Sequence, residues 1–358
     1  MRQRHSDYIL WAKTQSRARF NLATSGVGSF PLRELPVTID QLEINGDSTY
    51  GYAPLQQALA KKCGVDPDCV VASAGTSMAN HLAMATLIDP GDEVVVEQPT
   101  YEVLTSTLLY LGAVVKHFAR TEESGYALDP TQVRRVVTRK TRLIVLCNLH
   151  NPSSALASET ALREIGGIAR SVGARVLVDE VYLDLVYTNT PKTSFLLGPE
   201  FVVTNSLTKA YGLSGLRCGW VLAAPELVER MWHIHDLYGV NAAHPAERLS
   251  AIALDNLDSV AQRAKQVLAA NRPVLDSFLQ SRDDLACVRP AFGTVAFPKL
   301  LTRSVQELDR LLREKYETGV VPGHFFDAPQ HFRIGIGGDP EMTRAAFERL
   351  GKALDELR

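Results

Sequence analysis

Seven short apolar runs between residues 69 and 224 constrain the fold of this chain most strongly, because they alternate with segments of helical periodicity. We expect these runs to be strands at 69–74, 93–98, 113–118, 142–148, 175–180, 201–205 and 219–224. Helices are expected between them at 76–88, 101–111, 130–138 and 158–172. Several runs are β-branched and almost continuously apolar, as are strands buried on both faces of a parallel sheet. The alternation therefore predicts an α/β fold with a mostly parallel seven-stranded sheet sandwiched by helices.

The pattern changes after residue 224, where long helical segments are separated by only short apolar runs. Helices are expected, with few breaks, at 225–238, 243–280, 304–316 and 340–356, and short strands near 285–289, 294–299 and 332–336. This order is typical of a smaller α+β domain. We therefore predict an N-terminal arm (1–45), a large domain (46–270) and a small C-terminal domain (271–358). The arm has no place in the predicted sheet, so it either packs with the small domain or crosses to another subunit.

The composition and the spacing of particular residues exclude several classes of partner. The 358 residues carry a formal net charge of −2, which provides no basic face for nucleic acid. No apolar stretch approaches the roughly 18 residues of a membrane span, so we expect no membrane partner. The five cysteines are odd in number and form no C-x-x-C pair, which favours a reduced, cytoplasmic protein. His233 and His235 lie two apart on a predicted helix, and so on different faces, and we expect no metal site.

Polar side chains follow the predicted strands at the edge where open α/β sheets bind their ligands. Gly75, Thr76 and Ser77 begin a helix, where backbone amides and hydroxyl groups form a cradle for an anion. Taken alone, an ordinary helix cap explains these three residues more simply. Tyr101 offers an aromatic face and Asn151 offers an amide, although packing and turn formation account for each of them separately.

A carboxylate and two cations follow other strands of the same sheet. Asp179 ends a buried run, where its charge is costly without a cation or donor, and Tyr182 follows one helical turn later. Lys209 follows the strand at 201–205, and a lysine there forms a Schiff base when its pKa is lowered. Arg217 offers a planar fork of donors for a phosphate. Together the strand ends fit a flat, phosphorylated aldehyde with a ring nitrogen, and pyridoxal 5′-phosphate meets each requirement.

Four motifs resemble those of the fold-type I, class I/II aminotransferases of the aspartate aminotransferase superfamily. Residues 206–220, SLTKAYGLSGLRCGW, resemble the family signature S-x-x-K-x-[FY]-x-x-x-G-x-R-x-G-[WY]. LHNPSSAL (149–156) is similar to the family's N-P-T-G element, DEVYLDL (179–185) to its D-E-x-Y element, and HFRIGIGG (331–338) to its C-terminal arginine strand. The resemblance covers the chain from about Tyr50 to the C-terminus.

The resemblance implies a role for each matching residue. Lys209 would form the Schiff base with pyridoxal 5′-phosphate and move the proton at the substrate Cα, while Asp179 would pair with the ring nitrogen. Tyr182 and Asn151 would contact the ring 3′-oxygen, and Tyr101 would stack on the ring. The residues implied to hold the phosphate are Gly75, Thr76, Ser77, Ser206 and Arg217.

The resemblance also implies a site for the substrate. Arg333 would bind the α-carboxylate through two parallel hydrogen bonds, beside Asn151, although an exposed edge-strand arginine is the simpler explanation without the other motifs. The N-terminal segment 21–27 would close over the substrate and bring Gly26 to it. Phe325 and Phe326 near the mouth favour a substrate with an apolar or aromatic side chain.

Two stretches depart from the family pattern. NPSS (151–154) lacks the glycine that usually follows the Asn-Pro turn, so we expect a different loop. The segment between the family's tyrosine and the next helix is shorter here than is usual in the family. Two residues, Tyr50 and Tyr52, are therefore candidates to reach the phosphate of a partner subunit. We favour Tyr50 and expect a homodimer.

The predicted function is amino transfer between an L-amino acid and a 2-oxo acid, by ping-pong chemistry through the Lys209 Schiff base. The alternative is a C–S β-lyase, a decarboxylase or a racemase of the same fold, because all of these use the same lysine, aspartate and arginine. A non-catalytic regulator that binds pyridoxal phosphate is less favoured. Such regulators add a basic DNA-binding domain, for which the residues before 50 leave no room, and Lys209 is intact.

Overall fold

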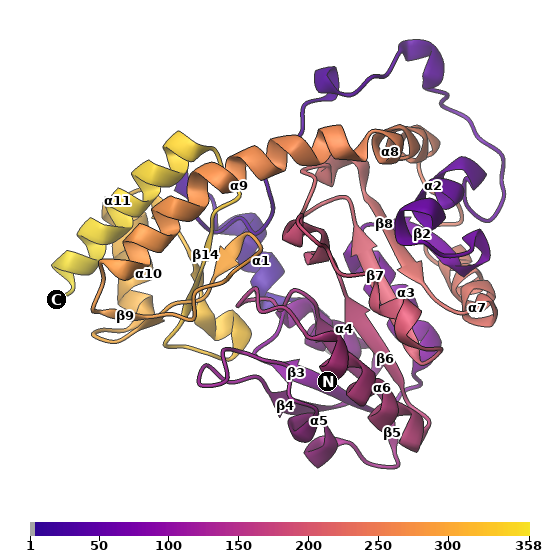
Figure 1. Ribbon diagram of the computed structural model, residues 1–358, viewed down its shortest axis with the longest axis horizontal. Helices are drawn as coiled ribbons and strands as arrows, with labels where there is room; N and C mark the ends of the chain where they lie inside the picture. The colour runs from indigo at the N-terminus through magenta and orange to yellow at the C-terminus, as the bar shows by residue number, and fades with distance from the viewer. Residues whose placement is uncertain (1–3) are drawn as a thin grey trace.

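The computed structural model describes residues 4–358 and is built around one seven-stranded sheet (Figure 1). Its strands are β2 (Val70–Ala74), β3 (Glu93–Gln98), β4 (Val114–Ala119), β5 (Thr141–Cys147), β6 (Arg175–Asp179), β7 (Phe201–Ser206) and β8 (Cys218–Leu222). They lie in the order β2-β8-β7-β6-β5-β3-β4, and only β8 is antiparallel to its neighbours. The predicted mostly parallel α/β sheet is confirmed.

Alternate residues of these strands pack on opposite faces of the sheet, as the two-residue period of a strand requires. In β5, Ile144 and Leu146 share a core with α2, α5 and α6, whereas Leu143 and Val145 share one with α3, α4 and α7. The helices are α2 (Ala53–Cys63), α3 (Thr76–Leu87), α4 (Glu102–Leu111), α5 (Pro130–Val136), α6 (Glu159–Val172) and α7 (Pro225–Asp236). Burial on both faces explains why the strand sequences are continuous apolar runs.

The chain beyond α7 forms a second, mainly helical part, in which the long helix α9 lies beside α11 (Figure 1). Its helices are α8 (His244–Asp255), α9 (Leu257–Gln280), α10 (Val305–Lys315) and α11 (Pro340–Glu356). Its short strands are β9 (Leu285–Ala286), β10 (Val295–Ala296), β11 (Lys299–Leu300), β12 (Thr318–Gly319), β13 (Val321–Pro322) and β14 (Phe332–Gly335). Helix α9 continues across position 270, the predicted boundary between the large and small domains.

The helical segment expected over 243–280 has one break, at Asn256. This residue ends α8 and precedes α9, with φ −115° and ψ 23°. Its side-chain Nδ2 donates to the carbonyl of Ile252 at 2.8 Å. An asparagine side chain competes in this way with the helix's own backbone bonds, which explains why the helix stops there.

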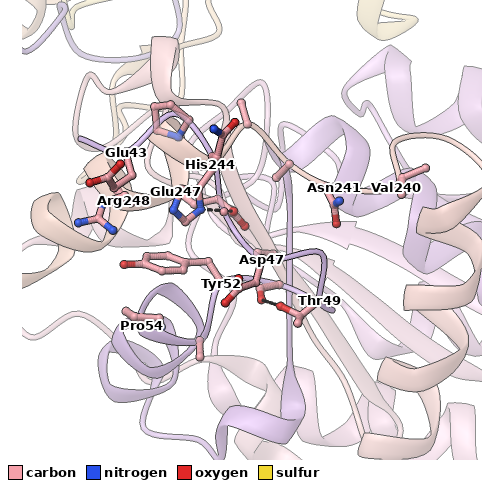
Figure 2. A pocket seen from close by; sticks show the side chains of 18 of the residues that line it. Glu43, Asp47, Thr49, Tyr52, Pro54, Val240, Asn241, His244, Glu247 and Arg248 are labelled. Carbon is pink, nitrogen blue, oxygen red and sulfur yellow. Dashed lines mark hydrogen bonds and ion pairs between the residues drawn. The ribbon is translucent and has the colours of Figure 1, made fainter. Parts of the chain in front are cut away.

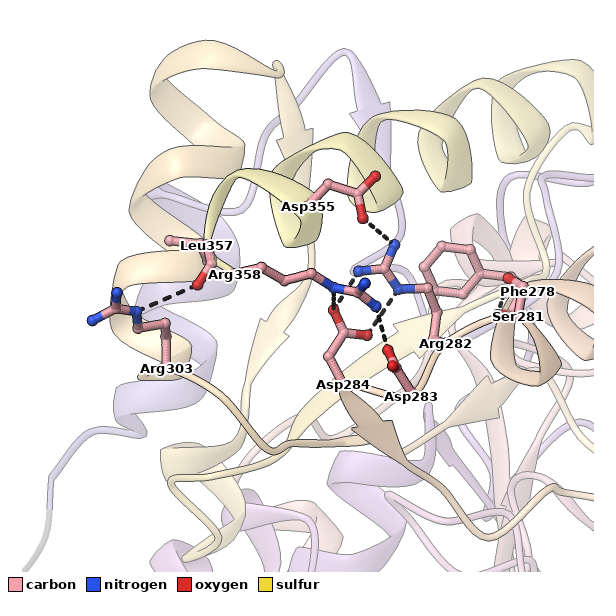
Figure 3. A network of polar contacts seen from close by, with 9 residues as sticks. All are labelled: Phe278, Ser281, Arg282, Asp283, Asp284, Arg303, Asp355, Leu357 and Arg358. Atoms are coloured by element: carbon pink, nitrogen blue, oxygen red, sulfur yellow. Dashed lines mark hydrogen bonds and ion pairs between the residues drawn. The ribbon is translucent and has the colours of Figure 1, made fainter.

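Charged side chains tie the C-terminus to the end of α9 (Figure 3). Arg282 binds Asp284 and also donates to Asp355 at 2.6 Å, and Arg358 Nε donates to Asp284 at 3.3 Å. Burial alone would raise the pKa of Asp284, but the two arginines outweigh it and lower that pKa. The buried carboxylate is thus compensated, and α11 is fixed to β9.

The N-terminal residues lie along the strands of the C-terminal part. Helix α1 (Asp7–Thr14), which the sequence pattern did not predict, is followed by β1 (Phe20–Asn21), parallel to β12. The carbonyl of Leu22 then accepts from Gly335 N at 2.6 Å. Residues 31–52 arch away from the body of the molecule and are mostly exposed (Figure 1). Among residues 4–358, no helix is both long and apolar enough to cross a membrane.

Candidate active site

A cavity of about 170 Å³ opens at the carboxyl edge of the sheet, where the parallel strands end beside the start of β8. Its lining residues are Tyr8, Ser25, Thr76, Ser77, Asn80, Tyr101, Cys147, Asn151, Asp179, Val181, Tyr182, Ser206, Thr208, Lys209 and Arg217. The structure therefore brings most of the sequence-predicted residues to one place. Gly75, Gly26 and Arg333 adjoin these walls through Arg217, Lys209 and Asn151, respectively.

Asp179, the last residue of β6, is held by donors from two directions. Asn80 Nδ2 donates to its Oδ2 at 2.9 Å, and the backbone N–H of Val181 donates to Oδ1 at 3.1 Å. Thr204 Oγ1 donates to Asn80 Oδ1 at 2.6 Å and so fixes which way the amide points. Burial raises the pKa of Asp179 to about 6, although these donors and Lys209 oppose the rise. A cationic ring nitrogen beside this carboxylate would restore its charge.

Lys209 lies three residues beyond β7 and reaches into the same cavity. Its Nζ donates to Ser25 Oγ at 2.9 Å. Burial lowers the pKa of Lys209, and the nearby charge of Arg333 adds to this effect, while Tyr8 and Asp179 act against it. A lowered pKa increases the neutral amine fraction, which is the form that attacks a carbonyl carbon and accepts a proton.

The start of α3 and Arg217 form one end of the cavity. Gly75 has a φ of 84°, and a Cβ there would collide with the Arg217 guanidinium group, so only glycine suits this position. Arg217 is exposed and donates to the carbonyl of Ala74 at 3.0 Å. Thr76 Oγ1 is buried yet has no partner among the described residues. The backbone amides at the start of α3, this hydroxyl group and the guanidinium group together suit a phosphate.

Arg333 in β14 is 1% exposed and lies between Asn151 and Tyr8. Its two terminal nitrogens donate to Asn151 Oδ1 at 2.9 Å and to Tyr8 Oη at 2.8 Å. Its Nε is buried and finds no partner within residues 4–358. Burial alone would lower the pKa of Arg333, but Tyr8 and Tyr182 outweigh it and raise that pKa. The guanidinium group therefore stays charged, contrary to the simpler reading of an exposed edge residue.

The NPSS loop (151–154) has a residue in the left-handed backbone conformation that favours glycine, although the loop contains no glycine. Ser154 has a φ of 62°, and its Oγ donates to the carbonyl of Val295 at 2.8 Å. A Cβ on Gly293 would lie 2.6 Å from Ser154 Oγ, so Gly293 provides the space for this side chain. Ser154 stands where the family usually has a glycine, and Gly293 on the facing segment leaves room for its side chain.

Comparison with known proteins identifies the family to which the chain belongs. The model of the family "Aminotransferase class I and II" matches residues 40–350. The chain belongs to this family. The predicted pyridoxal phosphate-dependent aminotransferase and its fold are thereby confirmed.

Several known proteins are similar to this chain along most of their length. A capreomycidine synthase from Streptomyces vinaceus is 31% identical over 352 residues, covering 94% of this chain and 90% of that protein. An aspartate/prephenate aminotransferase from Thermus thermophilus is 27% identical over 319 residues, covering 85% and 82%. A solved aminotransferase from Streptococcus suis, described as PLP-dependent, superposes with a TM-score of 0.94 at 25% identity, covering 100% and 99%. A PLP-dependent cyclase, OrfR, superposes with a TM-score of 0.89 at 23% identity, covering 99% and 98%.

The family implies pyridoxal phosphate as its cofactor, and the residues of this aminotransferase suit that group. Tyr182 is buried and Tyr101 is half-buried, and the loss of solvent around each hydroxyl group raises the pKa of both, so these groups stay protonated. Gly26 leaves room for Lys209, because a Cβ on Gly26 would lie 3.2 Å from its Cα and Cδ. Among residues 4–358, no group of three or more histidine, cysteine, aspartate or glutamate side chains is placed to hold a metal ion.

Tyr50 is not at this cavity within one chain. Its hydroxyl group donates to Asp236 at 3.0 Å, its ring stacks on Trp232 at 5.8 Å, and it is 52% exposed. Tyr52 instead lines a separate cavity of about 700 Å³ between residues 43–54 and 240–248 (Figure 2). Within one chain, neither candidate tyrosine lines the candidate active-site cavity.

Sequence reasoning missed Tyr8, Ser25 and Asn80. Ser25 lies in the segment 21–27 that the resemblance places over the substrate, although only Gly26 was named there. Tyr8 lies outside the motifs and has no strand pattern to place it, so no signal pointed to it. Asn80 could have been found from the sequence, because it lies one helical turn after Thr76 on the face of α3 that packs on the sheet. A polar residue on an apolar helix face is a signal for a buried partner, here Asp179.

Proposed function

We propose that this aminotransferase moves an amino group between an L-amino acid and a 2-oxo acid by ping-pong chemistry. The observation that carries the proposal is the convergence of Lys209, Asp179 and Arg333. A lysine with a lowered pKa and a buried carboxylate face one cavity, and a buried, charged guanidinium group adjoins it.

Each residue has a task around the cofactor. Asp179 would face the ring nitrogen, Tyr101 the ring plane, and Tyr182 and Asn151 the ring 3′-oxygen. When bound, pyridoxal phosphate supplies an electron sink for the bond cleaved at Cα. The phosphate would be held by Gly75, Thr76, Ser77, Ser206 and Arg217.

Lys209 would act both as anchor and as base. Its Nζ would hold the cofactor through the aldehyde carbon. As a free, neutral amine in the same cavity, it would be placed to accept and return the proton at the substrate Cα. Arg333 would bind the α-carboxylate beside Asn151, with Gly26 close to the substrate, so that the Cα–H bond stays aligned with Nζ.

The experiment is a panel of L-amino acid donors with 2-oxoglutarate and pyruvate as acceptors. We expect amino acid product to form only when an acceptor is present. Double-reciprocal plots of the rate should give the parallel lines of a ping-pong mechanism. Apolar and aromatic donors should lead the panel, because the rings of Tyr8 and Phe326 pack against Arg333 and Tyr8 also meets Phe325. Product formation that never depends on a 2-oxo acid would contradict the proposal.

A second candidate is a reaction other than transamination on the same cofactor. It is favoured by the 31% identity to a capreomycidine synthase and by the superposition on a cyclase. A cyclase, C–S β-lyase, decarboxylase or racemase would act on the amino acid without an acceptor. Release of ammonia, carbon dioxide or a cyclic or inverted amino acid in the donor-only arm distinguishes these activities.

We further propose that the protein is a homodimer whose subunits meet at residues 39–50 and 237–240. Exposed apolar side chains gather on these segments, namely Ile39, Ile44, Tyr50, Leu237, Tyr238 and Val240. Ile44, Tyr50 and Val240 also border two cavities on this face. An exposed apolar face of this kind is typical of a subunit contact, and it would bring Tyr50 to the partner's phosphate. The three-part division of the chain at 45 and 270, and a cytoplasmic location, remain predictions from the sequence.

A further inference from the structure

We propose that Tyr8, on the N-terminal helix α1, is a direct ligand of the substrate carboxylate, donating its hydroxyl proton beside Arg333. The proposal rests on the function proposed above, because it places the α-carboxylate at Arg333. It adds a residue that the sequence motifs do not contain, 325 positions away from that arginine in the chain.

The hydrogen bond between the two residues leaves the Tyr8 proton available. Arg333 donates to Tyr8 Oη at 2.8 Å, so the phenol oxygen is the acceptor in this bond. A hydroxyl group donates as well as accepts, and within the described part of the chain no acceptor takes the Tyr8 proton. Tyr8 lines the same cavity as Lys209 and Ser25, so a ligand there can accept that proton.

The position of the phenol is fixed by an aromatic enclosure. The Tyr8 ring meets Tyr101 edge-on at 5.6 Å and 82°, and Phe325 at 5.7 Å and 72°. Trp11, on the same helix, packs on Phe325 at 5.3 Å. Ser6, the N-cap of α1, donates to Glu102 of α4 and so holds the helix against the sheet domain. A donor fixed in this way loses little conformational freedom when a ligand binds.

The electrostatic setting strengthens Tyr8 as a donor. Burial alone would raise the pKa of Tyr8, but the positive charges of Arg333 and Lys209 outweigh it and lower that pKa. A more acidic phenol makes a stronger hydrogen bond to an anion. A carboxylate at this point would receive an N–H from Arg333 and the O–H of Tyr8, whereas a neutral amide group would gain much less from either.

Tyr8→Phe tests the proposal, because it removes one oxygen and keeps the ring. Calorimetry on the cofactor-loaded protein would measure binding of 3-phenylpropanoate, which has a carboxylate but no amino group, and of the neutral 3-phenylpropanamide. We expect Tyr8→Phe to weaken binding of the carboxylate about tenfold and to leave binding of the amide unchanged. The matched control is Tyr126→Phe, which removes a buried phenol of the same aromatic cluster, bonded to His331 rather than Arg333.

The outcomes separate this proposal from the function on which it rests. Unchanged carboxylate binding in Tyr8→Phe would overturn the role of Tyr8 alone. Equal weakening of both probes would assign Tyr8 to packing and would also overturn it. A wild-type protein that does not prefer the carboxylate to the amide would overturn the assignment of Arg333 itself. Thermal unfolding of each variant shows whether the fold is kept, and kcat and KM for the best donor give a second reading, with the change expected in KM.

Discussion

At the scale of single residues, the buried carboxylate of Asp179 serves function but lowers the free energy of unfolding of the cofactor-free protein at neutral pH. Its pKa is 3.8 in an exposed peptide and about 6 in the folded protein, so the folded state holds a proton more tightly than the unfolded one. Stability from this group is therefore present in acid and is lost as pH rises through about 6. We expect Asp179→Asn to stabilise the cofactor-free protein at pH 8, by roughly 3 kcal/mol at most, while abolishing amino transfer.

Denaturant unfolding of the two cofactor-free proteins at several pH values measures this effect. The advantage of Asp179→Asn should be largest above about pH 6 and should shrink as the pH is lowered towards 4. A variant that is less stable than the wild type at pH 8 would show that the carboxylate is already well compensated in the folded protein.

Asn80 should tune the same carboxylate through its hydrogen bond. Removing this donor in Asn80→Ala should raise the pKa of Asp179 further and weaken pyridoxal phosphate binding near neutral pH. Thr204→Val, which frees the Asn80 amide to turn, should have a smaller effect in the same direction. Cofactor affinity as a function of pH checks both variants, and equal affinity in all three proteins would rule out this role.

At the scale of elements, the strands were predictable and the N-terminal helix was not. Strands such as β5 are buried on both faces, so their apolar runs stand out in the sequence. Helix α1 has eight residues, and its position depends on contacts such as Tyr8 with Arg333 that no local period encodes. The motif residues at the strand ends could be predicted because parallel strands bring their carboxyl ends to one edge.

The loop at Ser154 gives an element-scale prediction. Gly293→Ala should destabilise the protein by roughly 2–4 kcal/mol, because the new methyl group strains a φ of 77° and overlaps Ser154. Adding Ser154→Gly should recover part of this loss, with a coupling energy of about 0.5–2 kcal/mol. Chemical denaturation of both single variants and the double variant provides the thermodynamic cycle. Strictly additive effects would mean that the two segments relax independently.

At the scale of the whole molecule, the exposed apolar face at residues 39–50 and 237–240 leads to a prediction about assembly. Leu237 is 79% exposed, so Leu237→Asp should leave the fold of one subunit intact and disrupt the proposed dimer. Light scattering should find a dimer for the wild type and a monomer for the variant. Leu301→Asp, a change at a 54% exposed leucine in the C-terminal part, serves as the control and should remain dimeric. A dimeric Leu237→Asp protein would place the subunit contact elsewhere.

The contacts between distant parts of the molecule limit how much of the site could be predicted from the sequence. The type of reaction could be predicted because Lys209, Asp179 and Arg333 each lie in a recognisable motif. The substrate site also needs the N-terminal segment, where Ser25 and Tyr8 meet Lys209 and Arg333 only after the chain has folded. Contacts between residues so far apart leave no period or spacing in a single sequence.

The most direct test of the central claim is the absorption spectrum of the cofactor-loaded protein on mixing with an amino donor and no acceptor. The wild type should show one stoichiometric change in the visible band and release one equivalent of 2-oxo acid. Lys209→Ala should show no such turnover, because no neutral amine is present to move the proton at Cα. A Lys209→Ala protein that releases 2-oxo acid as fast as the wild type would contradict the account.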